Sequence, residues 1–274
     1  MESNGAQAGL EVEVGAAGTR YGNWLPGSAI GVMAFFALLT GVLAVIAATV
    51  VPSVPLLVLY VVLCVICVAL LAWFAAIRHA YSFGGGKLMA KVHANLLQHL
   101  QPGSQGSMLD VGCGSGALAV AIAKASPDAQ VTGVDPFDAG KLATAAQCEA
   151  NAQAEGVAPQ CTFVQGDLAA LPFEDASFDV VVSNLAYHAL PQKDKTALVL
   201  ESLRVLKPGG AFALQDSFDA KRTFGSPEEL VAALRQAGVS EVRYEGGAGA
   251  QGLLPRYVLL PPGIRRLGVL WGVK

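Results

Sequence analysis

The feature that most restricts the fold of this chain is a long stretch without any charged residue. No Asp, Glu, Lys or Arg occurs from Tyr21 to Ile77, although these residues make up 14% of the sequence. Two apolar runs, 30–51 and 56–77, flank a Pro-Ser-Val-Pro sequence at 52–55 that cannot continue a helix. Because about 22 helical residues cross a hydrocarbon core of about 30 Å, the stretch predicts a transmembrane helical hairpin over 24–78.

Basic residues beside the predicted hairpin indicate its orientation. Arg20 precedes the first helix, Arg78, Lys87 and Lys91 follow the second, and the turn between the helices carries no charge. Since basic residues are enriched on the cytoplasmic side of spanning helices, both termini are predicted to be cytoplasmic. Residues 1–23 are rich in Gly and Ala and begin with acidic instead of basic residues, so a disordered tail is expected and not a cleaved signal peptide.

Small residues recur on one face of the first predicted helix, at steps of three and four. They are Gly27, Gly31, Ala34, Ala37, Gly41, Ala44 and Ala48. Such a face allows close helix packing, and its expected partner is the second helix of the same hairpin, with a homodimer through this face as the alternative. Cys64 and Cys67 have the spacing of a metal or redox motif, but they lie in an apolar helix without a second ligand pair. Both are therefore expected to be packing residues, and no metal site is predicted.

The remaining composition argues against some classes of partner and compartment. A formal net charge of −3 gives no reason to expect a nucleic-acid partner. The five cysteines lack the regular spacing of a disulfide framework, which favours a reducing compartment.

Beyond a juxtamembrane linker and helix at 79–102, the pattern changes to short apolar strands that alternate with helical stretches. This alternation predicts an α/β domain over 103–274 with a doubly wound, mostly parallel, seven-stranded sheet. The expected strands are 107–111, 130–134, 161–165, 179–183, 211–215, 241–245 and 267–273, and the expected helices are 87–100, 116–125, 139–155, 193–206 and 227–236. The last helix has a capping box formed by Ser226 and Glu229, with Pro227 in its first turn.

A glycine-rich turn follows the first expected strand. Its sequence is Asp110-Val111-Gly112-Cys113-Gly114-Ser115-Gly116, and glycines at such a turn let the backbone approach a ligand closely. The second strand ends in Asp135, where a carboxylate accepts both ribose hydroxyl hydrogens of a nucleoside. A nucleoside-bearing cofactor is therefore predicted. Taken alone, the turn also satisfies the looser dinucleotide fingerprint through Gly112, Gly114 and Ala117.

With three further motifs, the sequence resembles the class I S-adenosylmethionine-dependent methyltransferases over about 108–210. The turn with Asp110 is similar to the first motif of that family. Gln165-Gly166-Asp167-Leu168 is similar to the third-strand motif, Phe178-Asp179-Val180-Val181-Val182-Ser183-Asn184 to the fourth-strand motif, and Arg204-Val205-Leu206-Lys207-Pro208-Gly209-Gly210 to the turn before strand five. The resemblance implies S-adenosylmethionine as cofactor and a Rossmann-like fold.

The resemblance also implies which residues hold the cofactor. Asp110 and the glycine turn face its methionyl part, Asp135 the ribose, Phe137 a face of the adenine, and Asp167 with the Leu168 amide the adenine edge. The full set implied is Asp110, Gly112, Cys113, Gly114, Gly116, Asp135, Pro136, Phe137, Asp167, Leu168 and Asn184. The alternative is that Asp110, Asp135 or Asp167 merely caps a helix or a turn.

Methyl transfer from a sulfonium is a direct displacement, so a general base is needed only if the acceptor must lose a proton. The candidates lie beyond strands four and five: His188, Tyr187 and Asp216. His188 suits proton acceptance because an unperturbed imidazole has a pKa near 6.5, and its alternative is a surface or helix-end histidine. Tyr187 is expected to line the acceptor pocket, and Asp216 has a cap at the strand end as its alternative.

The sequence restricts the class of methyl acceptor mainly by exclusion. Relatives that methylate amines of nucleic-acid bases often carry Asn-Pro-Pro-aromatic after strand four, whereas this chain has Asn184-Leu185-Ala186-Tyr187. The sequence resembles instead the small-molecule, type 11-like branch that includes quinone and sterol methyltransferases, and a small hydrophobic or lipid acceptor at the membrane is expected. Segment 246–266 is expected to be either a lid or membrane-touching segment, or an insertion packed on the sheet. A membrane-bound NAD(P)-dependent reductase and a noncatalytic cofactor-binding module remain as alternative functions.

Overall fold

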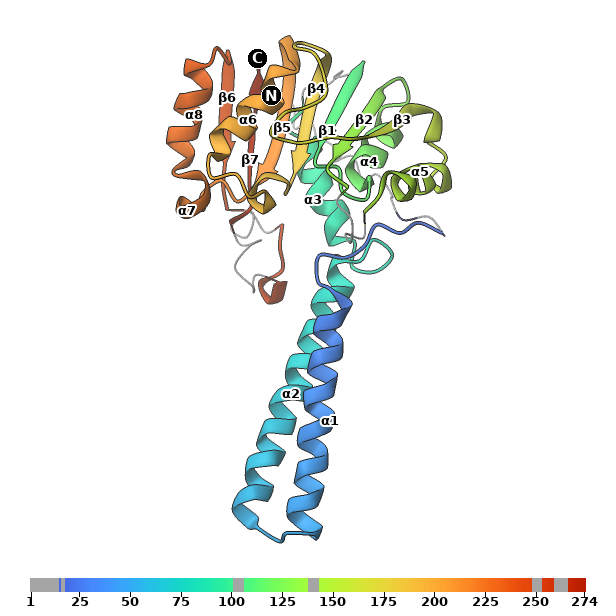
Figure 1. Ribbon diagram of the computed structural model, residues 1–274, viewed down its shortest axis with the longest axis vertical. Helices are drawn as coiled ribbons and strands as arrows, with labels where there is room; N and C mark the ends of the chain where they lie inside the picture. The colour runs from blue at the N-terminus through green and yellow to red at the C-terminus, as the bar shows by residue number, and fades with distance from the viewer. Residues whose placement is uncertain (1–14, 16–17, 101–105, 138–142, 248–252, 259–265) are drawn as a thin grey trace, which may run out of the picture. The chain divides into compact units, whose positions relative to one another are not determined.

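The computed structural model describes residues 15, 18–100, 106–137, 143–247, 253–258 and 266–274 (Figure 1). The chain divides into two compact units. One is Asn23–Lys87, and the other combines Met1–Gly22 with Leu88–Lys274.

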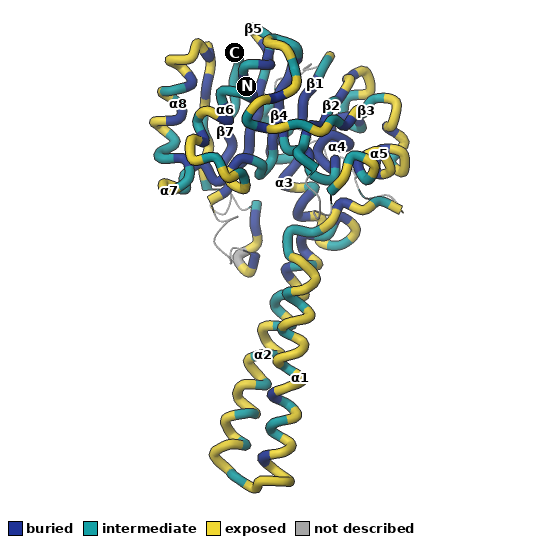
Figure 2. Tube along the Cα trace, in the orientation of Figure 1, coloured by how far each residue is buried: buried dark blue, intermediate teal, exposed yellow. Residues whose placement is uncertain are grey.

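The first unit contains two long helices, α1 (Gly27–Thr49) and α2 (Val54–Tyr81). Their apolar side chains are exposed along most of their length, including Leu38 at 70% and Val65 at 64%, as Figure 2 shows. Soluble proteins seldom expose so large an apolar surface. Both helices are long and apolar enough to cross a membrane. The turn lies at 50–53 instead of 52–55, because α1 ends at Thr49 and Pro55 sits in the first turn of α2, where a missing N–H breaks no helical bond.

The small-residue face of α1 packs within the hairpin. The Cys64 Sγ of α2 lies 3.6 Å from the carbonyl oxygen of Ala37, and a Cβ added to Gly41 would lie 3.7 Å from the same sulfur. Cys64 therefore fills the space that small residues leave between two closely approaching helices.

The second unit contains a seven-stranded sheet of order β3-β2-β1-β4-β5-β7-β6, in which only β7 runs antiparallel to its neighbours. The strands are β1 (Ser107–Val111), β2 (Gln130–Asp135), β3 (Cys161–Gln165), β4 (Phe178–Asn184), β5 (Leu206–Asp216), β6 (Glu241–Glu245) and β7 (Gly268–Val273). The helices are α3 (Leu88–Leu97), α4 (Ala117–Ala125), α5 (Ala145–Ala154), α6 (Lys195–Arg204), α7 (Lys221–Phe224) and α8 (Pro227–Gln236). The predicted doubly wound, mostly parallel sheet is confirmed.

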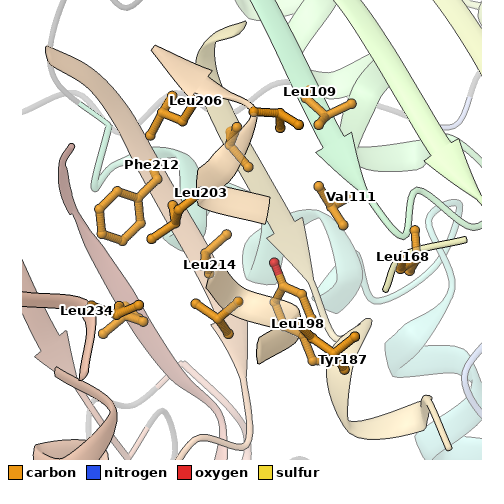
Figure 3. Close-up of a cluster of buried hydrophobic side chains, with 14 of the residues drawn as sticks. Leu109, Val111, Leu168, Tyr187, Leu198, Leu203, Leu206, Phe212, Leu214 and Leu234 are labelled. Carbon is orange, nitrogen blue, oxygen red and sulfur yellow. The ribbon is translucent and has the colours of Figure 1, made fainter. Parts of the chain in front are cut away.

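A continuous hydrophobic core fixes one face of this sheet (Figure 3). Leu109 and Val111 of β1 and Leu214 of β5 meet Leu198 of α6 and Leu234 of α8 in one buried cluster. Alternate residues of a strand point to the same face, so the intervening residues Asp110 and Gln215 point to the other face. The predicted capping box of α8 is also confirmed, with the Glu229 amide donating to the Ser226 hydroxyl at 3.2 Å.

Within the second unit, several elements differ from the sequence expectation. Strand β5 begins at Leu206 instead of residue 211, because the chain end pairs with the Lys-Pro-Gly-Gly segment: the Gly209 amide donates to the Lys274 carbonyl at 2.8 Å. Helix α5 begins at Ala145, with Thr144 as N-cap; part of the expected helix 139–155 lies outside the described residues. The short helix α7 was not expected.

Residues 18–22, part of the expected disordered tail, belong to the second unit and have defined contacts within it. The Tyr21 side chain is only 8% exposed, and its carbonyl oxygen accepts a hydrogen bond of 2.8 Å from the Ser115 hydroxyl. Of segment 246–266, the described Leu254 and Val258 are buried and Tyr257 is half exposed. The rest of that segment lies largely outside the described residues.

Candidate cofactor and acceptor site

The residues implied in cofactor and acceptor binding gather at one edge of the sheet, because β1 to β5 are parallel and their carboxyl ends meet there. The glycine-rich turn follows β1, Asp135 ends β2, Asn184 ends β4 and Asp216 ends β5. In doubly wound sheets, ligands bind at this edge where the strand order reverses, which here is between β1 and β4.

The turn after β1 needs its glycines. Gly112, Gly114 and Gly116 have φ of +74°, +54° and +79°, which are values that other residues adopt at a cost. A Cβ on Gly112 would lie 2.3 Å from the Cβ of Ala186, whereas a Cβ on Gly114 would meet nothing within 4 Å. The turn thus packs closely against the loop after β4 and leaves bare backbone with open space at Gly114. This open backbone fits a closely approaching ligand.

Cys113 contributes backbone rather than side chain to this turn. Its side chain is buried, and its Sγ lies 2.9 Å from where a Cβ of Gly133 would stand. The nearby Cys148 sulfur contacts the Gly114 carbonyl oxygen at 3.1 Å. Both thiols therefore pack beneath the turn.

Asp110 presents a buried carboxyl group with unused hydrogen-bonding capacity. It is 1% exposed, and within the described part of the chain its Oδ2 has no hydrogen-bond partner. Burial raises the pKa of this carboxyl to about 7; the Ala119 amide, which hydrogen-bonds to it, opposes that shift, and the nearby Asp135 charge adds to it. A buried carboxyl of this kind suits a cationic ligand group.

Asp135 connects the end of β2 to the glycine turn. Its Oδ2 accepts the Gly114 amide at 3.0 Å, and its Oδ1 accepts the Phe137 amide at 3.1 Å. Each oxygen keeps a further lone pair for a ligand hydroxyl. Phe137 has φ of +46°, a strained conformation for a side-chain-bearing residue. Pro136, between them, accepts the Gln165 side-chain amide at 2.9 Å.

Asp167 and Leu168 follow β3. Asp167 is exposed, and its Oδ1 accepts the Ala169 amide at 2.8 Å, which is the turn-capping geometry of the alternative interpretation. The Leu168 side chain is buried in the hydrophobic core (Figure 3).

His188 and Asp216 form a paired group on the acceptor side. Asp216 is completely buried; its Oδ1 lies 3.0 Å from His188 Nδ1, and its Oδ2 accepts the His188 backbone amide at 3.1 Å. The hydrogen bond with Asp216 raises the pKa of His188, and partial burial and the Lys195 charge oppose this shift. Because the carboxylate accepts from Nδ1, Nε2 is the ring nitrogen placed to receive a proton. The sequence placed both residues near strand ends but did not indicate that they touch.

Tyr187 lies in the hydrophobic core, which differs from the expectation that it lines an acceptor pocket. Its side chain is fully buried in the cluster of Figure 3. Its hydroxyl donates to the Ser202 hydroxyl at 3.0 Å. Lys195 donates to the carbonyl oxygens of Tyr187 and Leu190 at 2.8 and 2.6 Å. These contacts hold the short turn that presents His188, so Tyr187 supports the neighbouring residue from inside the core.

Sequence reasoning missed Gln215, which lies beside Asn184. The two are Cα partners at the ends of β5 and β4, so their side chains share a sheet face. Gln215 is fully buried, yet within the described chain neither polar atom of its amide has a partner, and Asn184 Oδ1 is buried and unpartnered too. Buried amides without partners are rare and call for an explanation such as a ligand or water. The only sequence signal is a polar residue directly before Asp216.

Leu185, directly after Asn184, has φ of +57°. Its amide donates to the Gln215 carbonyl oxygen at 2.7 Å. This contact keeps the strained residue in place, and strain of this kind concentrates at functional sites.

Comparisons with known proteins agree with this geometry. A family model described as a methyltransferase domain matches residues 108–210. The sterol 4-C-methyltransferase strm-1 of Caenorhabditis elegans is 33% identical over 142 residues, which are 49% of this chain and 39% of that protein. The phthiotriol/phenolphthiotriol dimycocerosates methyltransferase of Mycobacterium leprae is 38% identical over 110 residues, which are 40% of this chain and 37% of that protein.

The fold comparison is with proteins of lower identity. Geranyl diphosphate C-methyltransferase from Streptomyces coelicolor A3(2) has a TM-score of 0.53 at 16% identity, over 69% of this chain and 83% of that one. This likeness concerns the fold alone. The chain spans about two fifths of the length of these two curated relatives. The family match at 108–210 includes the glycine turn and the ends of β2 to β4. The chain contains a methyltransferase domain of the class I S-adenosylmethionine-dependent family.

Proposed function

We propose that the chain is a membrane-anchored methyltransferase that moves a methyl group from S-adenosylmethionine to a small hydrophobic or lipid acceptor, with His188 as general base. The observation that carries this proposal is the His188–Asp216 pair. It lies at the carboxyl ends of β4 and β5, beside the glycine turn on β1.

The proposed cofactor contacts rest on residues whose chemistry fits the separate parts of S-adenosylmethionine. S-adenosylmethionine, when bound, supplies a methyl group on a positively charged sulfur. The buried Asp110 carboxyl and the open backbone at Gly114 fit the cationic methionyl part, and the Asp135 carboxylate fits the ribose hydroxyls. Phe137 and Asp167 are proposed to face the adenine, and Asn184 to lie near the reacting end.

The protein's part in the reaction is to orient the acceptor, exclude water and move one proton. Asp216 fixes the His188 ring through Nδ1, which leaves Nε2 to take the proton from an acceptor hydroxyl or ammonium group. Asp216 then stabilises the imidazolium, as a buried carboxylate does in other acid–base pairs. General-base catalysis of this type contributes roughly 10²–10⁴-fold to a rate.

The acceptor class is proposed from the anchor and from the relatives. Helices α1 and α2 would keep the domain at a membrane surface, where apolar acceptors are concentrated. One relative is named for sterol methylation and another for phthiotriol dimycocerosates. We propose that the domain and both termini face the cytoplasm. Basic residues precede the first helix and follow the second, whereas the turn between the helices carries no charge.

A transfer assay with labelled S-adenosylmethionine tests the function. The full chain in lipid nanodiscs is incubated with fractionated lipid and metabolite extract, and His188→Ala and Asp135→Ala are run beside it. Label is expected in an apolar fraction with the parent chain, and much less with either variant. Cofactor binding without transfer to any fraction contradicts the proposal and favours a noncatalytic module. Binding of a nicotinamide nucleotide in place of S-adenosylhomocysteine contradicts it as well, in favour of a reductase.

A further inference from the structure

The segment directly before the membrane hairpin is hydrogen-bonded to the glycine-rich turn and to the helix beneath it. The Ser115 hydroxyl, within the turn, donates to the Tyr21 carbonyl oxygen at 2.8 Å. The Arg20 amide donates to Asn151 Oδ1 at 2.7 Å, and Asn151 Nδ2 donates to the Arg20 carbonyl oxygen at 3.3 Å. Arg20 is therefore held through both of its backbone polar groups.

Asn151, on α5, joins this segment to the cofactor turn. It is completely buried, and its Nδ2 also donates to the Ser115 carbonyl oxygen at 2.9 Å. One carboxamide thus contacts the backbone of Arg20 and that of Ser115, which are far apart in sequence. The Gln147 side chain donates to the same Oδ1 at 3.1 Å and fixes which end of the amide accepts.

Tyr21 adds a second attachment. Its ring is buried, and its hydroxyl donates to Glu155 Oε1 at 3.3 Å. Glu155 is itself fixed by Lys124, whose ammonium lies 2.7 Å from Oε2. Burial, followed by the Glu155 charge, raises the pKa of Tyr21, so the phenol stays protonated and able to donate at neutral pH. This attachment is independent of Asn151.

We propose that Arg20 and Tyr21 form a clamp on the glycine-rich turn, with Asn151 as its positioning residue, and that the closed clamp increases the affinity of the domain for its nucleoside cofactor. The turn has three residues with positive φ and few side chains to fix it, so its shape depends on neighbouring contacts. A turn held in the binding conformation loses less conformational entropy when a ligand binds.

The proposal has a reciprocal consequence. If the closed clamp strengthens cofactor binding, the bound cofactor must stabilise the clamp by the same factor. Because Gly22 is followed directly by the unit Asn23–Lys87, the clamp is covalently continuous with the anchor and hydrogen-bonded to the cofactor turn. This inference concerns binding and does not depend on the acceptor or on methyl transfer.

The first test measures S-adenosylhomocysteine affinity by calorimetry on the full chain in nanodiscs. Asn151→Ala, Tyr21→Ala and a chain lacking residues 1–22 are each expected to raise the Kd by about 5- to 20-fold, from the loss of one or two hydrogen bonds. Gln153→Ala is the matched control, because Gln153 is an exposed residue of the same helix. It is expected to bind like the parent. Unchanged affinity in both Tyr21→Ala and the shortened chain overturns the proposal, whatever Asn151→Ala does to folding.

The second test uses trypsin, which cleaves after Arg20. Cleavage at this bond, followed by mass spectrometry, is expected to slow several-fold when S-adenosylhomocysteine saturates the parent chain and Gln153→Ala. In Asn151→Ala, cleavage is expected to be faster and to respond little to the ligand. A rate of cleavage after Arg20 that is the same with and without ligand in the parent chain shows that clamp and cofactor are uncoupled, and overturns the proposal. A purely structural contact would not produce this ligand dependence.

Discussion

His188 Nδ1 lies 3.0 Å from Oδ1 of Asp216, whose carboxylate is completely buried, while the imidazole remains 44% exposed. The pair joins the loop after β4 to the end of β5 and gives the histidine one fixed ring orientation. The buried partner cannot easily exchange its hydrogen bond for water, so the orientation is held even though the ring reaches the surface. Both the ionisation and the direction of the proposed base therefore depend on Asp216.

The pH dependence of turnover is expected to report this pair. Pairing with Asp216 raises the pKa of His188 above 6.5, so the neutral base predominates only at higher pH. A plot of log kcat/KM against pH should rise through that raised pKa and then level. Asp216→Asn should move the inflection to lower pH, because burial and the Lys195 charge then act without the carboxylate, and should lower the plateau. A profile that Asp216→Asn leaves in place contradicts the assignment.

The raised pKa of His188 also determines the direction in which the unfolding free energy changes with pH. A raised histidine pKa stabilises the folded chain fully below about pH 6.5, and this stabilisation is lost as the pH rises through the folded-state pKa. In Asp216→Asn, the corresponding change of unfolding free energy with pH should disappear. Chemical denaturation between pH 5.5 and 8.5 measures it.

Asp135→Ala is expected to weaken S-adenosylmethionine binding by about 1.5–3 kcal/mol, because charge-assisted bonds to the ribose are removed together. The variant also loses the acceptors of the Gly114 and Phe137 amides, so the turn itself loosens. Asp135→Asn keeps one acceptor oxygen, so its affinity for the cofactor should lie between those of the parent chain and of Asp135→Ala. Calorimetry with S-adenosylhomocysteine measures these affinities. Equal affinity in the parent chain and both variants would show that the end of β2 does not bind the ribose.

Asp110 is expected to release a proton when a cationic cofactor binds. Its pKa is about 7 in the cofactor-free chain, and a positive sulfonium nearby favours the ionised form. Because the folded-state pKa is raised, the unfolding free energy of the free chain should fall as pH rises from about 4 to about 7, and Asp110→Asn should remove that fall. Calorimetry at pH 6.5 in buffers of different ionisation enthalpy measures how many protons are released when the cofactor binds. No release with S-adenosylmethionine contradicts a contact between this carboxyl and the cation.

Gln215→Met is expected to leave the folded chain as stable or to raise its unfolding free energy by about 1–2 kcal/mol. An isolated buried amide loses its hydrogen bonds to water on folding, and methionine has a similar volume without that penalty. If the amide serves the acceptor or an ordered water beside it, turnover falls while cofactor affinity does not. A destabilised variant with normal turnover would show that Gln215 has a structural partner and no role in the reaction. Asn184→Leu is a useful comparison, since its amide lies on the neighbouring strand.

Removing residues 1–77 is expected to yield a domain that stays soluble without detergent and still binds cofactor, because every strand and the glycine turn lie beyond the cut. Its affinity should be lower than that of the full chain by the factor that the clamp contributes. Activity on a soluble acceptor should persist, and activity on a membrane-resident acceptor should fall sharply because tethering no longer concentrates the domain at the membrane. An insoluble or cofactor-blind product would place the hairpin within the core of the domain.

The sequence by itself determined those features that depend on neighbouring residues. The charge-free stretch predicts two helices of spanning length, since the cost of burying charge in lipid acts residue by residue along the helix. Ser226, Pro227 and Glu229 give the start of α8 because a capping box is closed within four positions. The glycine turn and Asp135 were likewise predicted from local spacing around two strand ends.

Tertiary structure decided which residues meet across long separations. Tyr187 and His188 are adjacent in the sequence, but the packing of η2 (Tyr187–Ala189) against α6 sends the tyrosine into the core and leaves the histidine beside Asp216. His188 and Asp216 are 28 positions apart, and Arg20 and Asn151 are 131 positions apart. Such contacts follow from the parallel register of β4 with β5 and from the packing of α5 on the sheet. Local pattern does not encode them, because any polar residue at a strand end or in a tail satisfies the same periodicity.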